Sequence, residues 1–309
     1  MDYKKIVEAV FHDDPTLPST LIYDYGITRV YKINTSEPLI VRIVKDDTAS
    51  YQFQATLLDA VAGQDNLTAR ILYWETRSIG NQAYGIQVQT YIPGKPIEHY
   101  PNGKQSRAII KTIYELQQRL CAASSKVATN SVQNIHNIIK ERYSLVPDCP
   151  IKESAARLLE QKRYLKLMSQ PEQCVIHGDL WYKNIHLEQT ENQIKVRLID
   201  FEPLISGPNI LQPAILFSSY FLLSALLFES DRLYLFNMDE LFSYWPESLN
   251  KDDILLMMLV FPVALSLLKE IRFSKSPDAD PEIRQLTMDP LEKSIQIIRK
   301  ISGLKVFGC

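Results

Sequence analysis

The chain has 309 residues, of which 46% are apolar and 23% are charged, and this composition is ordinary for a globular protein. Its length exceeds what one small hydrophobic core needs and fits two lobes. A formal net charge of −2 argues against a basic surface that would collect nucleic acid or anionic lipid.

The N-terminal part of the chain is predicted to form a small antiparallel sheet accompanied by helices. Residues 1–14 have the pattern of a short amphipathic helix, and Ser50–Gly63 has helical spacing followed by a glycine stop. Four segments are rich in β-branched and aromatic residues and are predicted to be strands: residues 28–34, 39–44, 69–76 and 83–92. Turn residues between neighbouring segments favour an antiparallel meander.

A breaker cluster, PGKP at residues 93–96, marks the change to a mainly helical pattern. Helical periodicity follows in three segments: residues 106–120, 131–145 and 153–168. Residues 184–189 and 195–201 alternate on either side of a turn at Thr190–Asn192, which predicts a hairpin. From Pro213 onward the pattern is helical again.

Several features favour a cytoplasmic protein without a membrane span. The N-terminus lacks the apolar core of a signal peptide. The longest apolar run, residues 213–228, is shorter than the ~20 residues of a membrane span and contains three serines, so we interpret it as a buried core helix. The cysteines show no paired spacing, so we expect neither a disulfide framework nor a cysteine-ligated zinc site, as in a reducing cytosol: Cys121, Cys149, Cys174 and Cys309.

The chemistry-bearing residues gather around the stretch CVIHGDLWYKNIHL, residues 174–187. Here Asp179 interrupts an apolar run, and Asn184 follows five residues later, where the predicted hairpin begins. Asp200 lies at the other end of that hairpin, so we expect two carboxylates and one amide to converge. Oxygen ligands of this kind suit Mg²⁺ held through one or two carboxylates and substrate phosphates.

These residues carry a resemblance to a known family. HGDLWYKN matches H-x-D-x-x-x-x-N, and LIDFE matches the metal-binding Asp-Phe element of the kinase fold. The strands YGITRVYKIN and LIVRIVK, with the hinge-like QTYIPGKPI, resemble choline and ethanolamine kinases. The chain therefore resembles the aminoglycoside phosphotransferase/choline kinase superfamily from about Tyr25 to Gln212. No G-x-G-x-x-G loop is present, which disfavours a protein kinase.

The resemblance implies an α+β, bilobal protein-kinase-like fold with a small antiparallel-sheet N-lobe and a mainly helical C-lobe. Residues 1–92 would form the nucleotide-binding lobe, and residues 93–309 the helical lobe with the catalytic loop and acceptor site. It also implies an ATP- and Mg²⁺-dependent phosphotransferase acting on a hydroxyl of a small molecule, such as an amino alcohol or an aminoglycoside. We expect no nucleic-acid or membrane partner, and the oligomeric state stays open.

The resemblance also assigns roles to individual residues. Asp179 would position the acceptor hydroxyl and take its proton, and Asn184 and Asp200 would hold Mg²⁺ on the ATP phosphates. His177 is expected to support the loop by hydrogen bonding rather than to bind a ligand. Lys183 either helps to neutralise a phosphate or is a solvated loop lysine.

In the N-lobe, Arg42 and Lys45 are both candidates for the cation that binds the phosphates. They lie on opposite faces of their strand. The family pattern and the cost of an unpaired charge in an apolar strand favour Arg42. Gly26 either forms the phosphate-covering turn or a plain hairpin turn. The adenine is expected at the hinge, on the backbone of Gln89, Tyr91 and Ile92.

Two departures from the family pattern support an alternative, a degenerate kinase-fold protein that binds nucleotide or ligand without catalysis. Gln52 or Gln54 stands where the family usually has a glutamate that pairs with the strand cation, and Gln54 matches best. Gln212 stands where choline kinases have an aspartate that braces the loop.

The acceptor is not identified by the sequence. A quaternary amine would need an aromatic cage. Candidates for such a cage are Trp181, Tyr182, Tyr220, Tyr244 and Trp245. A polycationic acceptor would need an acidic cleft, and the acidic stretches at residues 247–253 and 276–282 are interpreted as solvated loops.

Overall fold

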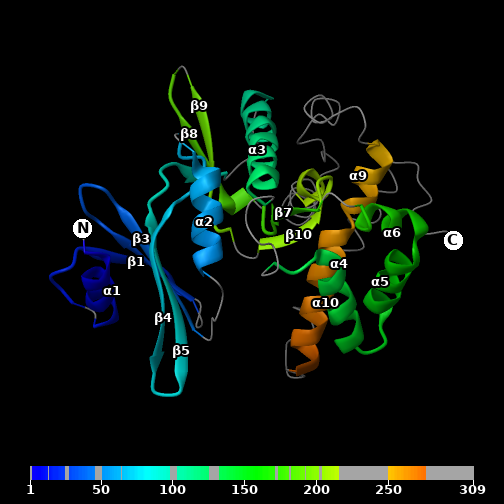
Figure 1. Cartoon of the computed structure of the whole chain (residues 1–309), viewed down its shortest axis with the longest axis horizontal. Coiled ribbons are helices and arrows are strands. Elements are labelled where there is room, and N and C mark those ends of the chain that lie inside the picture. The colour runs from blue at the N-terminus through cyan, green and yellow to red at the C-terminus, as the bar shows by residue number, and fades with distance from the viewer. Residues whose placement is uncertain are drawn as a thin grey trace.

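The computed structural model describes residues 2–12, 14–24, 28–45, 51–63, 65–97, 103–124, 132–170, 173–180, 182–191, 193–201, 204–215 and 250–275. Within these residues the chain forms an antiparallel-sheet region and a mainly helical region side by side (Figure 1). This arrangement confirms the predicted fold class.

The N-terminal sheet has the strand order β1-β2-β3-β5-β4 and is antiparallel throughout. Its strands are β1 (Ser19–Asp24), β2 (Thr28–Ile33), β3 (Leu39–Lys45), β4 (Ile71–Ile79) and β5 (Gln82–Thr90). The sequence pattern predicted four of these as separate strands, and β1, whose residues are all exposed, was not separated from the meander. The sheet lies between α1 and α2 (Figure 1).

The two helices of this region pack on the sheet for different reasons. In α1 (Tyr3–Phe11) the buried residues Ile6, Val7 and Val10 form one stripe against the sheet, and Asp2 caps the helix by accepting from Lys5 N–H. In α2 (Tyr51–Ala62), by contrast, Leu57, Leu58 and Val61 join the core of the helical region. The helix α2 therefore connects the sheet to the second region.

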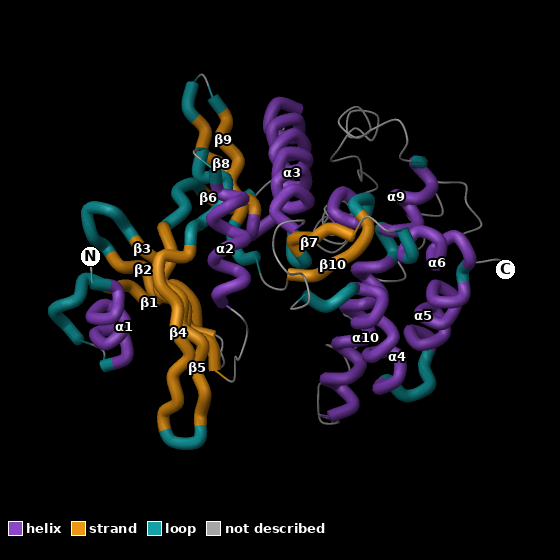
Figure 2. The backbone as a smooth tube through the Cα atoms, in the orientation of Figure 1, coloured by secondary structure: helices purple, strands orange, loops and turns teal. Residues whose placement is uncertain are grey.

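The second region is built from helices and two small sheets (Figure 2). Its helices are α3 (Gly103–Ser124), α4 (Ile135–Leu145), α5 (Pro150–Glu160), α6 (Lys162–Met168), α9 (Lys251–Met257) and α10 (Val260–Lys275). One sheet pairs β7 (Gln173–His177) with β10 (Leu204–Pro208), and the other orders β6 (Lys95–Pro96), β8 (Ile185–Gln189) and β9 (Ile194–Leu198) as β6-β8-β9. The hairpin β8–β9 was predicted, whereas β10 was not.

Two predictions need correction. The helix predicted over residues 153–168 is broken at Gln161, whose extended backbone (φ −72°, ψ 117°) ends α5 and begins α6. No glycine or proline marks this break in the sequence. The expectation of unpaired cysteines is also wrong for one pair, because Cys121 and Cys174 form a disulfide. Their separation of 53 residues gave no sign that α3 and β7 pack together.

Two aspartates of the acidic stretch at residues 247–253 stabilise the start of a helix. Asp252 and Asp253 lie in the first turn of α9, where negative charge is favoured, and both form ion pairs with Arg163. Among the described residues, no helix is long and apolar enough to cross a membrane. Only the first three residues of the predicted core helix at 213–228 fall within the described part, and the acidic stretch 276–282 lies outside it.

Candidate active site

A cleft of about 480 Å³ lies where the N-terminal sheet meets the loop after β7. Strands of the sheet, α2, the segment after β5 and the ends of the β8–β9 hairpin all contribute to its lining. The cleft brings together most of the predicted site residues: Arg42, Gln89, Tyr91, Ile92, Asp179, Asn184 and Asp200. The eighth, Gly26, lies outside the described residues.

The loop that carries Asp179 is supported by His177, which is fully buried at the end of β7. Its Nδ1 accepts the Asp179 backbone N–H at 3.2 Å, so its Nε2 carries the proton and donates to Ile199 O at 2.9 Å. Burial lowers the pKa of His177 to about 4, and the ring is therefore neutral near pH 7. His177 thus ties the loop to the strand that ends before Asp200.

The backbone of His177 is held in turn by Gln212. The Gln212 Oε1 accepts the His177 N–H at 3.0 Å, and both residues are fully buried. The glutamine therefore supplies the acceptor that an aspartate was expected to supply at this position. A neutral amide does so without the cost of burying a charge.

Asp179 and Asn184 contact each other directly. The Asn184 Nδ2 donates to both Asp179 O (2.8 Å) and Asp179 Oδ2 (3.1 Å), which closes the loop into a compact turn. Burial, with a smaller contribution from the charge of Asp200, raises the pKa of Asp179 to about 6, while the bond from Asn184 opposes the rise. A carboxylate with such a pKa is suited to accept a proton near neutral pH.

Asp200 is brought to the same place by the β8–β9 hairpin. The hairpin register pairs Ile185 with Leu198, and the Ile199 N–H donates to Asn184 O at 3.0 Å. Asp200 itself adopts a left-handed backbone (φ 57°), a conformation that aspartate tolerates better than most residues. Asn184 and Asp200 therefore lie at adjacent ends of one hairpin.

These residues fit a magnesium ion. The hydrogen bonds of Asn184 within the described chain use its amide nitrogen and leave its Oδ1 available, and Asp200 supplies a carboxylate. No group of three or more His, Cys, Asp or Glu that could hold a metal occurs among the described residues. A site with two protein oxygen ligands suits Mg²⁺, which takes its remaining ligands from phosphates and water.

The structure brings Arg42, rather than Lys45, into the cleft. Arg42 lies in the middle of β3 and is mostly buried, whereas Lys45 is the exposed last residue of that strand. The Arg42 Nη1 lies 3.0 Å from Asp200 Oδ1 and forms an ion pair between the sheet and the second region.

A pair of amides lies beside Arg42, where the resemblance predicts a carboxylate. Gln87 is the partner of Arg42 in the β3–β5 register, and its Nε2 donates to Gln54 Oε1 of α2 at 2.9 Å. Both glutamines line the cleft. Gln87 was missed by the sequence reasoning, although a polar residue alternating with Ile86 and Val88 in a central strand could have pointed to it.

Of the three hinge residues predicted to hold adenine, one has a backbone donor left unpaired by the described residues. The Thr90 N–H donates to Arg70 O and the Tyr91 N–H to Pro38 O, whereas Gln89 lies within the central strand β5. The Ile92 N–H has no hydrogen-bond partner within the described chain. Of the three hinge residues, Ile92 is therefore the one able to donate to a nucleobase.

Most of the aromatic residues proposed for an acceptor site lie outside the residues that the structure describes. Trp181, Tyr220, Tyr244 and Trp245 lie outside the described residues, and of Tyr182 only the backbone is described. Lys183, which precedes Asn184, is exposed and lines the cleft.

Comparisons with known proteins identify the family to which the chain is similar. The family model described as "Phosphotransferase enzyme family" matches residues 26–221. None of the curated proteins matches the sequence at a significant level.

Solved structures share the fold at low sequence identity. The amicoumacin kinase hAmiN, in complex with AMP-PNP, Ca²⁺ and Ami, matches with TM-score 0.70 and 13% identity over 98% of this chain and 97% of that one. The choline kinase LicA from Streptococcus pneumoniae matches with TM-score 0.62 and 13% identity over 97% and 100% of the two chains. The Plasmodium vivax ethanolamine kinase matches with TM-score 0.59 and 14% identity over 93% and 85%.

Proposed function

The chain belongs to the phosphotransferase enzyme family, and from this premise we propose that it is an ATP- and Mg²⁺-dependent kinase that phosphorylates a hydroxyl group of a small molecule. The observation that carries the proposal is the convergence of Arg42, Asp179, Asn184 and Asp200 on one cleft. A cation, a base and two metal ligands are what phosphoryl transfer requires of a protein, because catalysis is mainly positioning and charge stabilisation.

In this proposal Asp179 orients the acceptor hydroxyl and takes its proton as the oxygen attacks the terminal phosphate. The raised pKa of Asp179 favours that transfer near neutral pH. His177 and Gln212 keep the loop in place through its backbone. Asn184 and Asp200 hold Mg²⁺, which when bound supplies positive charge against the phosphate oxygens.

The nucleotide would occupy the sheet side of the cleft. Arg42 would leave Asp200 and pair with the phosphates, because a guanidinium binds a phosphate group as readily as it binds a carboxylate. The Ile92 N–H would donate to the adenine. The domain division at residues 92 and 93 places these nucleotide contacts in residues 1–92 and the catalytic loop in residues 93–309, and we keep this division as part of the proposal.

For the acceptor we propose an amino alcohol such as choline or ethanolamine, an antibiotic such as an aminoglycoside, or a related metabolite. The solved structures of similar fold include kinases named for amicoumacin, choline and ethanolamine, which makes these compounds the first to test. The proposal also places the protein in the cytoplasm, where ATP is available.

The alternative, a kinase-fold protein that binds nucleotide without turnover, has two observations in its favour. Gln54 bonds Gln87 instead of neutralising Arg42, and Arg42 pairs with the proposed metal ligand Asp200. Against it, Asp179, Asn184 and Asp200 are all present and share one cleft.

A screen for ATP consumption separates the two functions. The purified chain is incubated with Mg²⁺-ATP and amino alcohols, sugars, aminoglycosides and other antibiotics, and Asp179→Ala serves as the control. Turnover with one acceptor class that the variant lacks supports the kinase. If no acceptor is consumed and ATP binding does not respond to Mg²⁺, the enzymatic proposal fails.

A further inference from the structure

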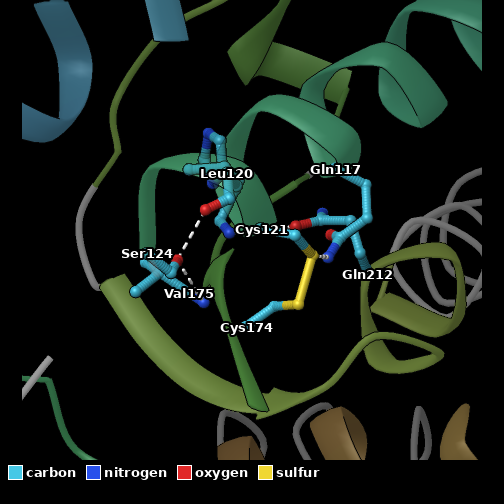
Figure 3. Close-up of a disulfide and its surroundings, with 8 residues drawn as sticks. Gln117, Leu120, Cys121, Ser124, Cys174, Val175 and Gln212 are labelled. Carbon is cyan, nitrogen blue, oxygen red and sulfur yellow. Dashed lines mark hydrogen bonds between the residues drawn. A yellow bond between two sulfur atoms is a disulfide. The ribbon is translucent and has the colours of Figure 1, made fainter. Parts of the chain in front are cut away.

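A disulfide joins the helix α3 to the strand that leads into the catalytic loop (Figure 3). Cys121 of α3 and Cys174 of β7 have Cα atoms 4.9 Å apart, within the ~4.4–6.8 Å that a disulfide requires. Cys174 lies five residues before Asp179. Of the remaining cysteines, Cys149 is free and Cys309 lies outside the described residues.

The strand β7 is held on both edges. One edge pairs with β10, from Leu204 opposite His177 to Pro208 opposite Gln173. The other edge faces α3, where the Val175 N–H donates to Ser124 Oγ at 3.0 Å next to the disulfide (Figure 3). The position of β7, and with it the start of the loop, therefore depends on its attachment to α3.

Two buried glutamines lie beside the disulfide, and one of them holds the backbone of the catalytic loop (Figure 3). The Gln117 Nε2 donates to Cys121 Sγ at 2.9 Å, and Figure 3 shows Gln117 and Gln212 on the same side of the disulfide. Gln212 in turn accepts the His177 N–H. The side chain that holds the loop backbone, Gln212, therefore lies beside the disulfide (Figure 3).

The amide groups of the two glutamines beside the disulfide do not make all of their possible hydrogen bonds. Gln117 Oε1 and Gln212 Nε2 are buried and have no hydrogen-bond partner within the described chain. A disulfide sulfur can only accept, so Gln117 directs its NH₂ group to Cys121, whereas a Cys121 thiol could donate to Gln117 Oε1. Gln117 can therefore bond Cys121 in either redox state, so these contacts are compatible with a disulfide that opens and closes reversibly.

We propose that Cys121 and Cys174 form a reversible thiol–disulfide pair that positions the catalytic loop, so that oxidation by a small disulfide such as glutathione disulfide raises turnover and reduction lowers it. The effect on turnover rests on the proposed function, whereas the effect on β7 does not. In a reducing cytosol, disulfides are usually redox-sensing or catalytic rather than permanent, which agrees with this assignment.

The exchange balances with the named oxidant. Cys121 is the more exposed of the two residues, so its thiolate attacks one sulfur of glutathione disulfide, forms a mixed disulfide and releases one glutathione thiolate. The Cys174 thiolate then attacks the Cys121 sulfur and expels the second glutathione. Two electrons pass from the protein thiols to glutathione disulfide, and the protons of the two protein thiols pass to the two glutathiones.

The first test counts thiols in the full chain after treatment with glutathione disulfide or with a dithiol reductant, followed by denaturation. With four cysteines in the sequence, we expect two free thiols in the oxidised protein and four in the reduced protein. Cys149→Ser should lower both counts by one, and Cys121→Ser should prevent formation of this pair. Four free thiols after oxidation of the wild type would overturn the proposal.

The second test measures amide hydrogen exchange in both redox states. A peptide covering residues 173–180 should exchange about tenfold more slowly in the oxidised protein, while a peptide in β5 should not change. Cys174→Ser should match the reduced wild type, and Cys149→Ser should keep the redox response. Equal exchange of residues 173–180 in both states would show that the disulfide does not position the loop.

Once an acceptor is known, reduction of the disulfide should change kcat but not KM for ATP. We expect kcat to fall about tenfold on reduction because the base moves relative to the acceptor, whereas KM for ATP stays constant because the hinge is not attached to β7. A redox-independent kcat, with the exchange difference present, would overturn the control of turnover. If the protein has no kinase activity at all, thiol counts and exchange still decide whether the pair positions β7.

Discussion

Arg42 Nη1 lies 3.0 Å from Asp200 Oδ1, so the cation proposed for the phosphates is paired with the carboxylate proposed for the metal. In the proposed function, metal therefore competes with Arg42 for Asp200 in the nucleotide-free protein. When Mg²⁺ and ATP bind together, the metal would take Asp200 and the phosphates would take Arg42. Mg²⁺ at Asp200 would free Arg42 for ATP, and ATP at Arg42 would free Asp200 for Mg²⁺, so Mg²⁺ and ATP should bind cooperatively.

The first prediction concerns Arg42→Gln. Without the guanidinium, Asp200 is free, so nucleotide-free protein should bind Mn²⁺, a spectroscopic substitute for Mg²⁺, about fivefold more tightly. ATP should bind more weakly, because its phosphates lose a charged partner. Electron paramagnetic resonance measures the first effect and titration calorimetry the second. Lys45→Gln, on the same strand outside the cleft, is the control, and weaker Mn²⁺ binding in Arg42→Gln would contradict the competition.

A second prediction concerns Asp179→Asn, which keeps the shape and the acceptor for Asn184. Turnover should fall by roughly 10²–10⁴ because the base is lost, with little change in KM for ATP. The fold should become more stable, because the shift of the Asp179 pKa from 3.8 to about 6 means that its charge destabilises the native state by at most about 3 kcal/mol.

The sign of this stability effect depends on pH. Between about pH 4 and pH 6 the native protein binds more protons at Asp179 than the unfolded chain does, so wild-type stability falls as pH rises through this window. The advantage of Asp179→Asn should be complete above pH 6 and absent below pH 4. Urea unfolding at pH 4 and pH 8 measures it, and an equal difference at both pH values would rule out Asp179 as the cause.

A third prediction concerns the pH dependence of the reaction. Because the base must be deprotonated, kcat/KM should be constant above about pH 7 and fall tenfold per pH unit below about pH 6. Circular dichroism over the same range separates this loss from unfolding. A profile without a break between pH 5 and pH 7 would show that Asp179 does not act as the base with this pKa.

Much of this site could be predicted because the motif residues follow local rules. Asp179 and Asn184 share one loop, and a hairpin necessarily brings Asp200 back to Asn184. Arg42 was distinguished from Lys45 because a charge in the middle of an apolar strand needs a partner, and Asp200 is such a partner in the structure.

The parts that could not be predicted depend on tertiary packing. The link between Cys121 and Cys174 arises from the packing of α3 on β7, which spacing along the chain does not report. The strand β10 is recognisable only through its pairing with β7, because LISGP lacks alternation. The amide pair of Gln54 and Gln87 required knowledge of which face of β5 meets α2.

A fourth prediction concerns Gln212. Gln212→Leu leaves the buried His177 N–H without an acceptor and should destabilise the fold by about 1–3 kcal/mol. It should also lower kcat without changing KM for ATP, because His177 begins the catalytic loop. Gln212→Glu retains an acceptor oxygen and should restore part of kcat. If Gln212→Leu has wild-type kcat per folded molecule, Gln212 supports only the fold.

The last prediction concerns the hinge, where the Ile92 N–H has no hydrogen-bond partner within the described chain and is proposed to donate to adenine. An ATP analogue with carbon in place of the purine N1 cannot accept this bond and leaves the donor unsatisfied, so it should bind about tenfold more weakly than ATP. The analogue with carbon in place of N7 keeps N1 and serves as the matched control. Both affinities are measured by competition with a fluorescent nucleotide. Equal binding of ATP and both analogues would mean that Ile92 does not hold the base, whereas weaker binding of the N7 analogue alone would place the other edge of the purine at the hinge.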